Sequence, residues 1–114
     1  MNIKEARENE ILVVNQIYDL LQLTEGDLSR EFIHIALSDI KTFDSKQHDY
    51  GSANIAEFGE KGVLVRVNDK VARLKNLLWG EKKPSNESIE DSWGDTSVYG
   101  VIARLCRRKL WPKV

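Results

Sequence analysis

Three carboxylates recur at intervals of four residues in the last third of the sequence: Glu87, Asp91 and Asp95. On an α-helix they fall within about 80° of one another. Val98 and Ile102 continue the same stripe, so the acids point in the direction in which the helix buries its core. Like charges at this spacing repel one another more strongly as water is withdrawn, and a divalent cation offsets that repulsion. The stripe therefore indicates either a metal site of the oxygen-ligand kind that Mg²⁺ prefers or a solvated, salt-bridged face.

A second stripe combines cations with one acid, and its members lie within about 100° of one another on a helix: Arg66, Asp69, Lys70 and Arg73. Because they flank an apolar stripe, their charged ends reach a cleft between helices while their stems pack. Guanidinium groups bind phosphate oxygens in a forked geometry, so cations beside acids fit a polyphosphate with its metal ion. Asp69 then joins the metal set. The alternative is an intrahelical salt bridge between Asp69 and Arg73, whose spacing is correct for one.

Four helices must position these stripes. Hydrophobic periodicity predicts them over residues 3–23, 28–44, 63–79 and from about 86–88 to 109. Residues 45–62 contain three glycines and many small polar residues, which predicts a long functional loop with one helical turn around "IAEF". No alternating strand pattern is strong enough to build a sheet. The predicted fold is therefore all-α, a compact bundle of about four helices with this loop between the second and the third.

The same periodicity predicts which side chains form the core. For the second helix the inward residues are Phe32, Ile33, Ala36, Leu37, Ile40 and Phe43. For the third helix they are Val63, Val67, Val71, Leu74 and Leu78.

Length and composition narrow the classes of protein. A chain of 114 residues fits a single domain over residues 1–114, and 41% hydrophobic with 31% charged residues is typical of a soluble, helix-rich domain. No apolar run is long enough to span a membrane or to serve as a secretory signal, so a cytoplasmic protein is expected. A net charge of −1 argues against a general nucleic-acid binder. Zinc, P-loop and dinucleotide-binding signatures are absent from the sequence.

Three ordered motifs resemble the nucleotide-modification-associated domain family of phages and bacteria, which is grouped loosely with MazG-like all-α nucleotide pyrophosphatases. They are "KQHDYG" (46 to 51), "RVNDKVARLKNL" (66 to 77) and "NESIEDSWGDTSVY" (86 to 99), and the resemblance covers roughly residues 38 to 105. The matching positions are Lys46, Asp49, Tyr50 and Gly51, then Arg66, Asp69, Lys70, Arg73 and Asn76, then Glu87, Ser88, Asp91, Asp95 and Tyr99.

What the resemblance implies is a metal-dependent pyrophosphohydrolase-like protein that acts on deoxynucleoside triphosphates in phage or bacterial nucleotide metabolism or modification. Mg²⁺, or Mn²⁺ in its place, is the expected cofactor, held by Asp69, Glu87, Asp91 and Asp95. Asp91 and Asp95 are the expected catalytic residues. The residues expected to bind the nucleotide and its phosphates are Lys46, Asp49, Tyr50, Arg66, Lys70, Arg73, Asn76 and Tyr99.

Two other classes of function remain open on the sequence. One is a non-catalytic phage-type protein that binds or sequesters a nucleotide, and the other is a helical interaction module whose charge stripes are salt bridges. We expect a homo-oligomer, a dimer or higher, because four helices of this size, with tryptophans near helix ends and a long polar loop, make a shallow cleft that a second copy closes. No specific nucleic-acid partner and no membrane is expected.

Overall fold

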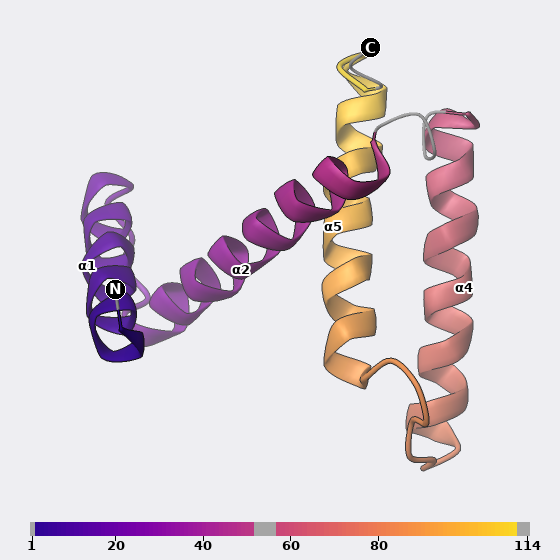
Figure 1. Cartoon of the computed structure of the whole chain (residues 1–114), viewed down its shortest axis with the longest axis horizontal. Coiled ribbons are helices and arrows are strands. Elements are labelled where there is room, and N and C mark those ends of the chain that lie inside the picture. Colours follow the sequence, from indigo (N-terminus) through magenta and orange to yellow (C-terminus); the bar gives the residue numbers. More distant parts are fainter. Residues whose placement is uncertain (1, 52–56, 112–114) are drawn as a thin grey trace. The chain divides into compact units, whose positions relative to one another are not determined.

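A computed structural model of the chain describes residues 2–51 and 57–111. Within these ranges it contains four helices and no strand: α1 (Ile3–Leu20), α2 (Asp27–Tyr50), α4 (Gly59–Trp79) and α5 (Ile89–Arg107) (Figure 1). The predicted all-α fold is confirmed. None of the described helices combines the length and the apolar character needed to cross a membrane.

Contacts between residues divide the chain into two units, residues 1–42 and residues 43–114. We call them the N-terminal and the C-terminal unit. The boundary falls within α2, so the last turns of this helix belong to the C-terminal unit together with α4 and α5. The single domain expected over residues 1–114 stays a prediction.

Polar contacts join α1 to the first part of α2 in the N-terminal unit. Arg30 Nε donates a hydrogen bond to Asn15 Oδ1 at 3.0 Å. Glu10 lies 3.1 Å from His34 Nδ1 and accepts a hydrogen bond from Lys41 Nζ at 3.3 Å. Since higher numbers on α2 pair with lower numbers on α1, the two helices run antiparallel. The hydrogen bonds from His34 and Lys41 also lower the pKa of the Glu10 carboxyl.

The N-terminal unit buries little apolar surface. Val14 is 1% exposed and Ile33 is 7% exposed. Phe32 and Ile40, both predicted to face inward, are 75% and 61% exposed, so the prediction is wrong for these two residues. The apolar face of α2 is wide, and a single neighbouring helix covers only part of it. Apolar residues at the edges of this face therefore stay exposed.

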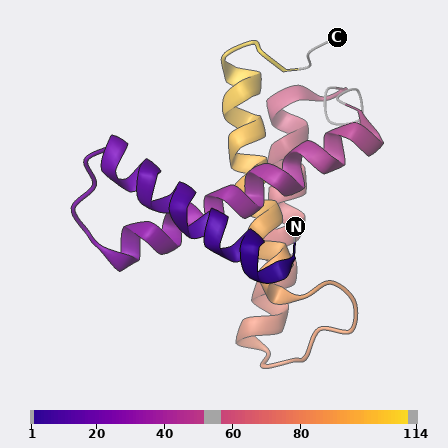
Figure 2. The same ribbon diagram turned by 60° about the vertical axis from the view of Figure 1, so that its left-hand side comes forward.

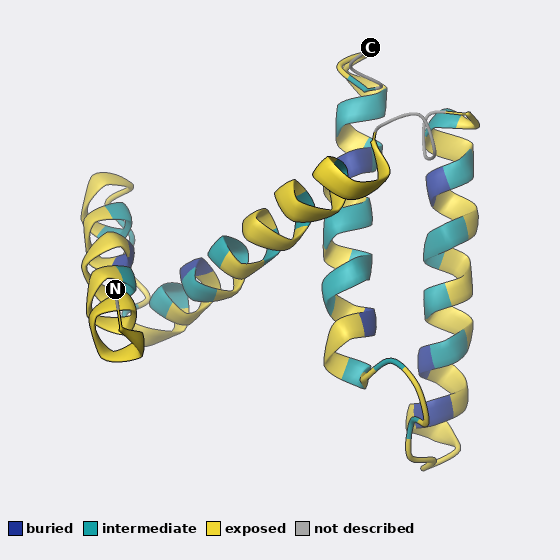
Figure 3. Cartoon of the chain, in the orientation of Figure 1, coloured by how far each residue is buried: buried dark blue, intermediate teal, exposed yellow. Residues whose placement is uncertain are grey.

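The C-terminal unit is built around the antiparallel pair α4 and α5, which contact each other and lie side by side in Figure 1, whereas they overlap in the turned view of Figure 2. Its buried residues are Val63, Leu74 and Leu77 on α4 and Ser92 and Ile102 on α5, and Figure 3 shows the buried positions along both helices.

Two predicted core positions of α4 are incorrect. Val71 is 37% exposed and Leu78 is 46% exposed, whereas Leu77, which was not predicted, is buried. Near the end of α4 the predicted buried position is therefore off by one residue. Leu77 and Leu78 are equally apolar, so hydrophobic periodicity alone does not show which of the two is buried.

The ends of α4 and α5 lie close to the predicted positions. The Ser88 side chain accepts a hydrogen bond from Asp91 N at 3.0 Å, so Ser88 caps α5 and satisfies one of the free N–H groups of its first turn. Gly80 follows the last helical residue of α4, and its N–H donates to Asn76 O at 3.2 Å. These caps set the length of the connection between α4 and α5.

The second helix is longer than the sequence predicts. It continues to Tyr50 rather than ending at Asp44, so Lys46, Asp49 and Tyr50 are helical and not part of a loop. The helix ends at Gly51, whose positive φ of 70° is the left-handed conformation that favours glycine after a helix. The polar residues before Gly51 include no proline or glycine that would stop the helix earlier. Of the helical turn predicted around "IAEF", Ile55 and Ala56 lie outside the described residues.

Candidate functional site

Six polar side chains meet where α4 faces the start of α5 and the end of α2. We call them the polar cluster: Lys46 from α2, Lys70 and Arg73 from α4, Ser92 and Asp95 from α5, and Glu87 from the connection before α5. All six belong to the C-terminal unit. Five of them were predicted as site residues from the sequence, and Ser92 was not.

Lys70 occupies the centre of the polar cluster. Its Nζ lies 2.9 Å from Oε1 and 2.8 Å from Oε2 of Glu87, and 2.8 Å from Oδ2 of Asp95. The other oxygen of Asp95, Oδ1, accepts a hydrogen bond from Lys46 Nζ at 3.0 Å. The carboxylate of Glu87, before the first turn of α5, and that of Asp95, after it, therefore both contact the ammonium group of Lys70 on α4.

Ser92 links the second cation to the same carboxylate. Arg73 Nη1 donates to Ser92 Oγ at 2.6 Å, and Ser92 Oγ donates in turn to Glu87 Oε2 at 2.6 Å. Arg73 Nη2 also donates to the backbone carbonyl of Glu87. Ser92 is 0% exposed, so its hydroxyl depends on these partners for hydrogen bonds.

A sequence signal for Ser92 exists in retrospect. One face of α5 carries Ser92, Tyr99 and Ala103, which are seven and four residues apart. This is the face of α5 that packs towards α4. A small hydroxyl residue on such a face needs a buried partner. Serine is also common at capping positions, and the neighbouring Ser88 fills that role here.

Ionisation in the polar cluster is set by opposing effects. Burial lowers the pKa of the Lys70 ammonium, but hydrogen bonds and charge from Asp95 and Glu87 outweigh it, so the pKa of Lys70 is raised. Burial likewise raises the pKa of the Asp95 carboxyl, but the hydrogen bonds from Lys70 and Lys46 outweigh it and the pKa of Asp95 is lowered. Both residues are therefore held in their charged forms. With three cations and two carboxylates, the polar cluster carries one net positive charge.

The predicted metal ligands are brought together in part. Glu87 and Asp95 converge on Lys70, whereas Asp69 and Asp91 are exposed. Across residues 2–51 and 57–111, no three His, Cys, Asp or Glu side chains are grouped so that they could hold a metal ion. The angular argument from the sequence assumed that Glu87 is helical, but α5 begins after the Ser88 cap, so the connection places Glu87 instead.

The predicted phosphate-binding residues also separate into two sets. Lys46, Lys70 and Arg73 are in the polar cluster, and Arg66 is half-buried one turn before Lys70. The others lie elsewhere: Asp49 and Tyr50 are exposed in the last turn of α2, Asn76 accepts a hydrogen bond from Lys82 at 3.1 Å, and Tyr99 lines a separate hollow between α4 and α5.

Comparison with known proteins yields no match to any family model, curated protein or solved structure. The resemblance to nucleotide-modification-associated and MazG-like proteins therefore rests on the three sequence motifs alone and stays a prediction. A function has to be argued from the chemistry of the polar cluster.

Substituting Ser92 tests whether the hydrogen bonds of the polar cluster hold α4 against α5. We expect Ser92→Ala to lower the free energy of unfolding by about 1–3 kcal/mol, because Arg73 and Glu87 lose a buried partner. Urea denaturation followed by circular dichroism measures this change. The matched control is Ser45→Ala at an exposed helical position of α2, which should change stability by less than about 0.5 kcal/mol. Equal, small effects of the two substitutions would contradict the structural role of Ser92.

Acid stability tests the ion pairs of Asp95. Because the folded pKa of Asp95 is lowered, its contribution to stability is fully present above the ordinary aspartate pKa of about 4 and is lost as the pH falls through the lower folded pKa. We therefore expect part of the decline in melting temperature below about pH 4 to disappear in Asp95→Asn. In the control Asp91→Asn the melting temperature should decline below about pH 4 as in the wild type, since Asp95 still forms its ion pairs with Lys46 and Lys70. If the melting temperature of Asp95→Asn fell below about pH 4 as much as that of the wild type, a stabilising role of the Asp95 ion pairs would be contradicted.

Proposed function

We propose that the protein binds a nucleotide polyphosphate together with Mg²⁺ at the polar cluster and acts as a nucleotide pyrophosphohydrolase-like protein. One observation carries the proposal: the carboxylates of Glu87 and Asp95 converge on a single cation, at 2.8 Å from the Lys70 ammonium in each case. Two carboxylates placed around one positive centre are suited to hold a divalent cation, for which Mg²⁺ with its preference for oxygen ligands is the natural choice.

The cations of the polar cluster supply the complementary half of the site. Lys46, Lys70 and Arg73 present ammonium and guanidinium groups, which bind phosphate oxygens through charge-assisted hydrogen bonds. Glu87 and Asp95 would hold the metal ion, and the Lys70 ammonium would then pair with phosphate oxygens in place of these carboxylates. The exchange keeps every charged group paired, which limits the cost of taking these charges from water.

The chemistry follows from these roles. Bound between Glu87 and Asp95, Mg²⁺ would neutralise charge on the triphosphate and lower the pKa of an attacking water molecule. Lys46, Lys70 and Arg73 would orient the phosphate chain for attack on the α-phosphorus, with pyrophosphate as the leaving group. Ser92 fixes the Arg73 guanidinium and the Glu87 carboxylate through hydrogen bonds that are already formed.

A specific observation favours the second candidate, a nucleotide-binding protein without turnover. Asp69 and Asp91 are exposed, so two of the four expected acids, including the catalytic candidate Asp91, lie away from the converging pair. Charge-assisted binding through Lys46, Lys70 and Arg73 needs none of these exposed acids. The two candidates differ in whether the bound nucleotide is converted.

The test begins with purified protein, Mg²⁺ and a panel of deoxynucleoside triphosphates, with chromatographic analysis of the nucleotide. A pyrophosphohydrolase releases monophosphate and pyrophosphate, whereas a binding protein retains an unchanged triphosphate. If no member of the panel binds or reacts, the proposed function is wrong.

Substituting Lys70 gives the sharper result. In Lys70→Gln the two carboxylates lose the cation that they share, so we expect Mg²⁺ alone to bind roughly tenfold more tightly and the triphosphate roughly tenfold more weakly. Titration calorimetry with each ligand measures both changes, and Lys75→Gln on the exposed side of α4 is the matched control. If the polar cluster serves packing alone, Lys70→Gln lowers stability and changes neither affinity.

We also propose a cytoplasmic homo-oligomer, a dimer or higher. The N-terminal unit buries Val14 and Ile33 but leaves Leu28 and Phe32 more than half exposed, and a second copy would cover such residues.

Light scattering at micromolar concentration should therefore give at least the mass of a dimer, and Phe32→Glu should shift it towards the monomer because a buried charge opposes association. The matched control Glu31→Gln, at the neighbouring exposed position, should leave the mass unchanged. A monomer mass for the wild type would contradict the proposal.

A further inference from the structure

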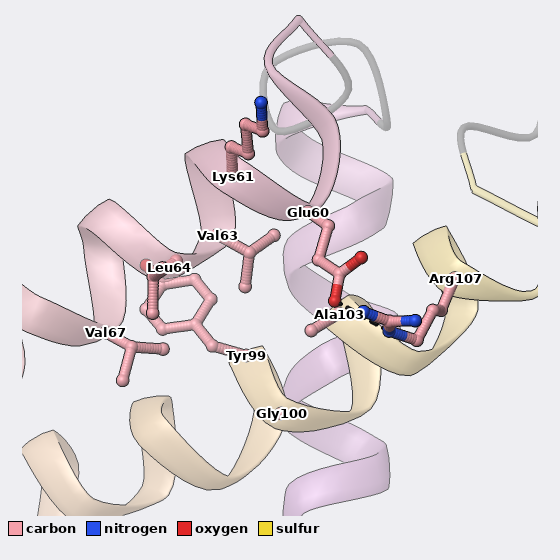
Figure 4. Close-up of a pocket in the computed structure, with 9 residues that line it drawn as sticks. All are labelled: Glu60, Lys61, Val63, Leu64, Val67, Tyr99, Gly100, Ala103 and Arg107. Atoms are coloured by element: carbon pink, nitrogen blue, oxygen red, sulfur yellow. Dashed lines mark hydrogen bonds and ion pairs between the residues drawn. The ribbon is translucent and has the colours of Figure 1, made fainter.

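A hollow of about 360 Å³ lies between the first half of α4 and the second half of α5, within the C-terminal unit. Figure 4 shows the nine residues that line it: Glu60, Lys61, Val63, Leu64, Val67, Tyr99, Gly100, Ala103 and Arg107. The volume falls in the range of small-molecule sites, and an apolar lining with a few polar groups is typical of them. The polar cluster uses none of these residues.

Gly100 helps to keep the hollow open. A Cβ atom built at this position would meet no atom within 4 Å, so the space beside the α5 backbone is unfilled. A glycine inside a helix costs about 1 kcal/mol relative to alanine, and no close packing of a neighbour against Gly100 offsets that cost.

The hollow and the polar cluster are neighbours along the same pair of helices. Tyr99 follows Asp95 by one helical turn on α5, and Val67 precedes Lys70 by less than one turn on α4. Glu60, at the far end of the hollow, precedes Lys70 by ten residues, which correspond to about 15 Å along the axis. A nucleotide has its base and its phosphates separated by a sugar, so one ligand can reach from the hollow to Lys70.

The polar groups of the hollow suit the edge of a base. Arg107 Nε donates to Glu60 Oε1 at 2.9 Å, and the side chains are 75% and 45% exposed. An ion pair this exposed contributes little to the stability of the fold. Replacing it with contacts to a ligand therefore costs little free energy. A carboxylate accepts two N–H bonds and a guanidinium donates to carbonyl oxygens. Guanine carries two adjacent N–H donor groups beside its O6 acceptor, so it satisfies both side chains, whereas adenine offers one donor group.

We propose that this hollow is a base-binding site that favours guanine, an inference that rests on the proposed binding of nucleotide phosphates at the polar cluster. The base packs against the apolar side chains of Leu64, Val67 and Tyr99, while Glu60 and Arg107 hydrogen-bond to its edge. The phosphates extend along the helices to Lys70 and Arg73.

Titration calorimetry with three ligands in the presence of Mg²⁺ separates the two sites: tripolyphosphate, dGTP and dATP. Tripolyphosphate reports the polar cluster alone. We expect dGTP to bind more tightly than tripolyphosphate, and at least about fivefold more tightly than dATP, the lower limit for discrimination by a paired hydrogen-bonding contact.

Gly100 provides a matched pair of variants. Gly100→Leu places a side chain in the hollow and should reduce the affinity for dGTP to that for tripolyphosphate, while Gly100→Ala should leave most of the advantage of dGTP. Both substitutions replace glycine with a better helix former, so both proteins should fold, and circular dichroism checks this. Tripolyphosphate affinity should be the same in both variants.

Glu60 tests the preference for guanine. Glu60→Gln should bring the affinities for dGTP and dATP to within about twofold of each other, because the amide replaces one acceptor oxygen with an NH2 donor and so no longer matches the two parallel N–H groups of guanine. The control Glu81→Gln, beyond the opposite end of α4, should keep the preference. Preference for guanine in Glu60→Gln equal to that of the wild type would overturn the role of Glu60.

The remaining outcomes distinguish the two proposals. If tripolyphosphate binds and dGTP binds no more tightly, the base-binding site is wrong and the polar cluster keeps its proposed role. If dGTP and dATP bind equally and more tightly than tripolyphosphate, the guanine assignment is overturned. If no ligand binds, both the proposed function and the base-binding site are wrong.

Discussion

One ammonium group, the Nζ of Lys70, is the contact on which the C-terminal unit depends. It bridges Glu87, which lies before α5, and Asp95, which lies in its second turn, and so fixes the start of α5 against the middle of α4. Ser92 and Arg73 reinforce the same region through buried hydrogen bonds. Removing one member of such a partly buried network leaves another charge without its partner, which is more costly than the loss of a surface ion pair. The network therefore has a structural role whether or not a ligand binds, and each functional test needs a readout besides stability.

Much of the fold could be predicted from the sequence, because it depends on local signals. The caps at Ser88 and Gly80 and the helical periodicity of α4 and α5 are properties of short segments. One failure depended on contacts between segments, and another on a local helix end that was predicted too early. Phe32 and Ile40 are apolar but exposed, since α1 covers just one strip of α2, and the helix predicted to end at Asp44 continues until Gly51.

The candidate site was predicted to a similar extent. Residue type and spacing identified Lys70, Arg73, Glu87 and Asp95, which do meet in the structure. The helical angle does not apply to Glu87, which precedes the cap, and Asp91 is exposed in the first turn of α5, so its place in a metal site stays a prediction. Ser92 was missed because its importance comes from burial, which the type of a single residue does not reveal.

Paramagnetic broadening by Mn²⁺ tests whether Glu87 and Asp95 hold a metal ion when a nucleotide is bound. Amide signals of ¹⁵N-labelled protein are recorded with a non-hydrolysable deoxynucleoside triphosphate as substoichiometric Mn²⁺ is added. We expect broadening to begin at residues next to Glu87 and Asp95 and on α4 around Lys70, and we expect Asp95→Asn to reduce it. Broadening centred on exposed acids such as Asp19 or Asp27, with the signals around Asp95 unchanged, would contradict a metal site at Glu87 and Asp95.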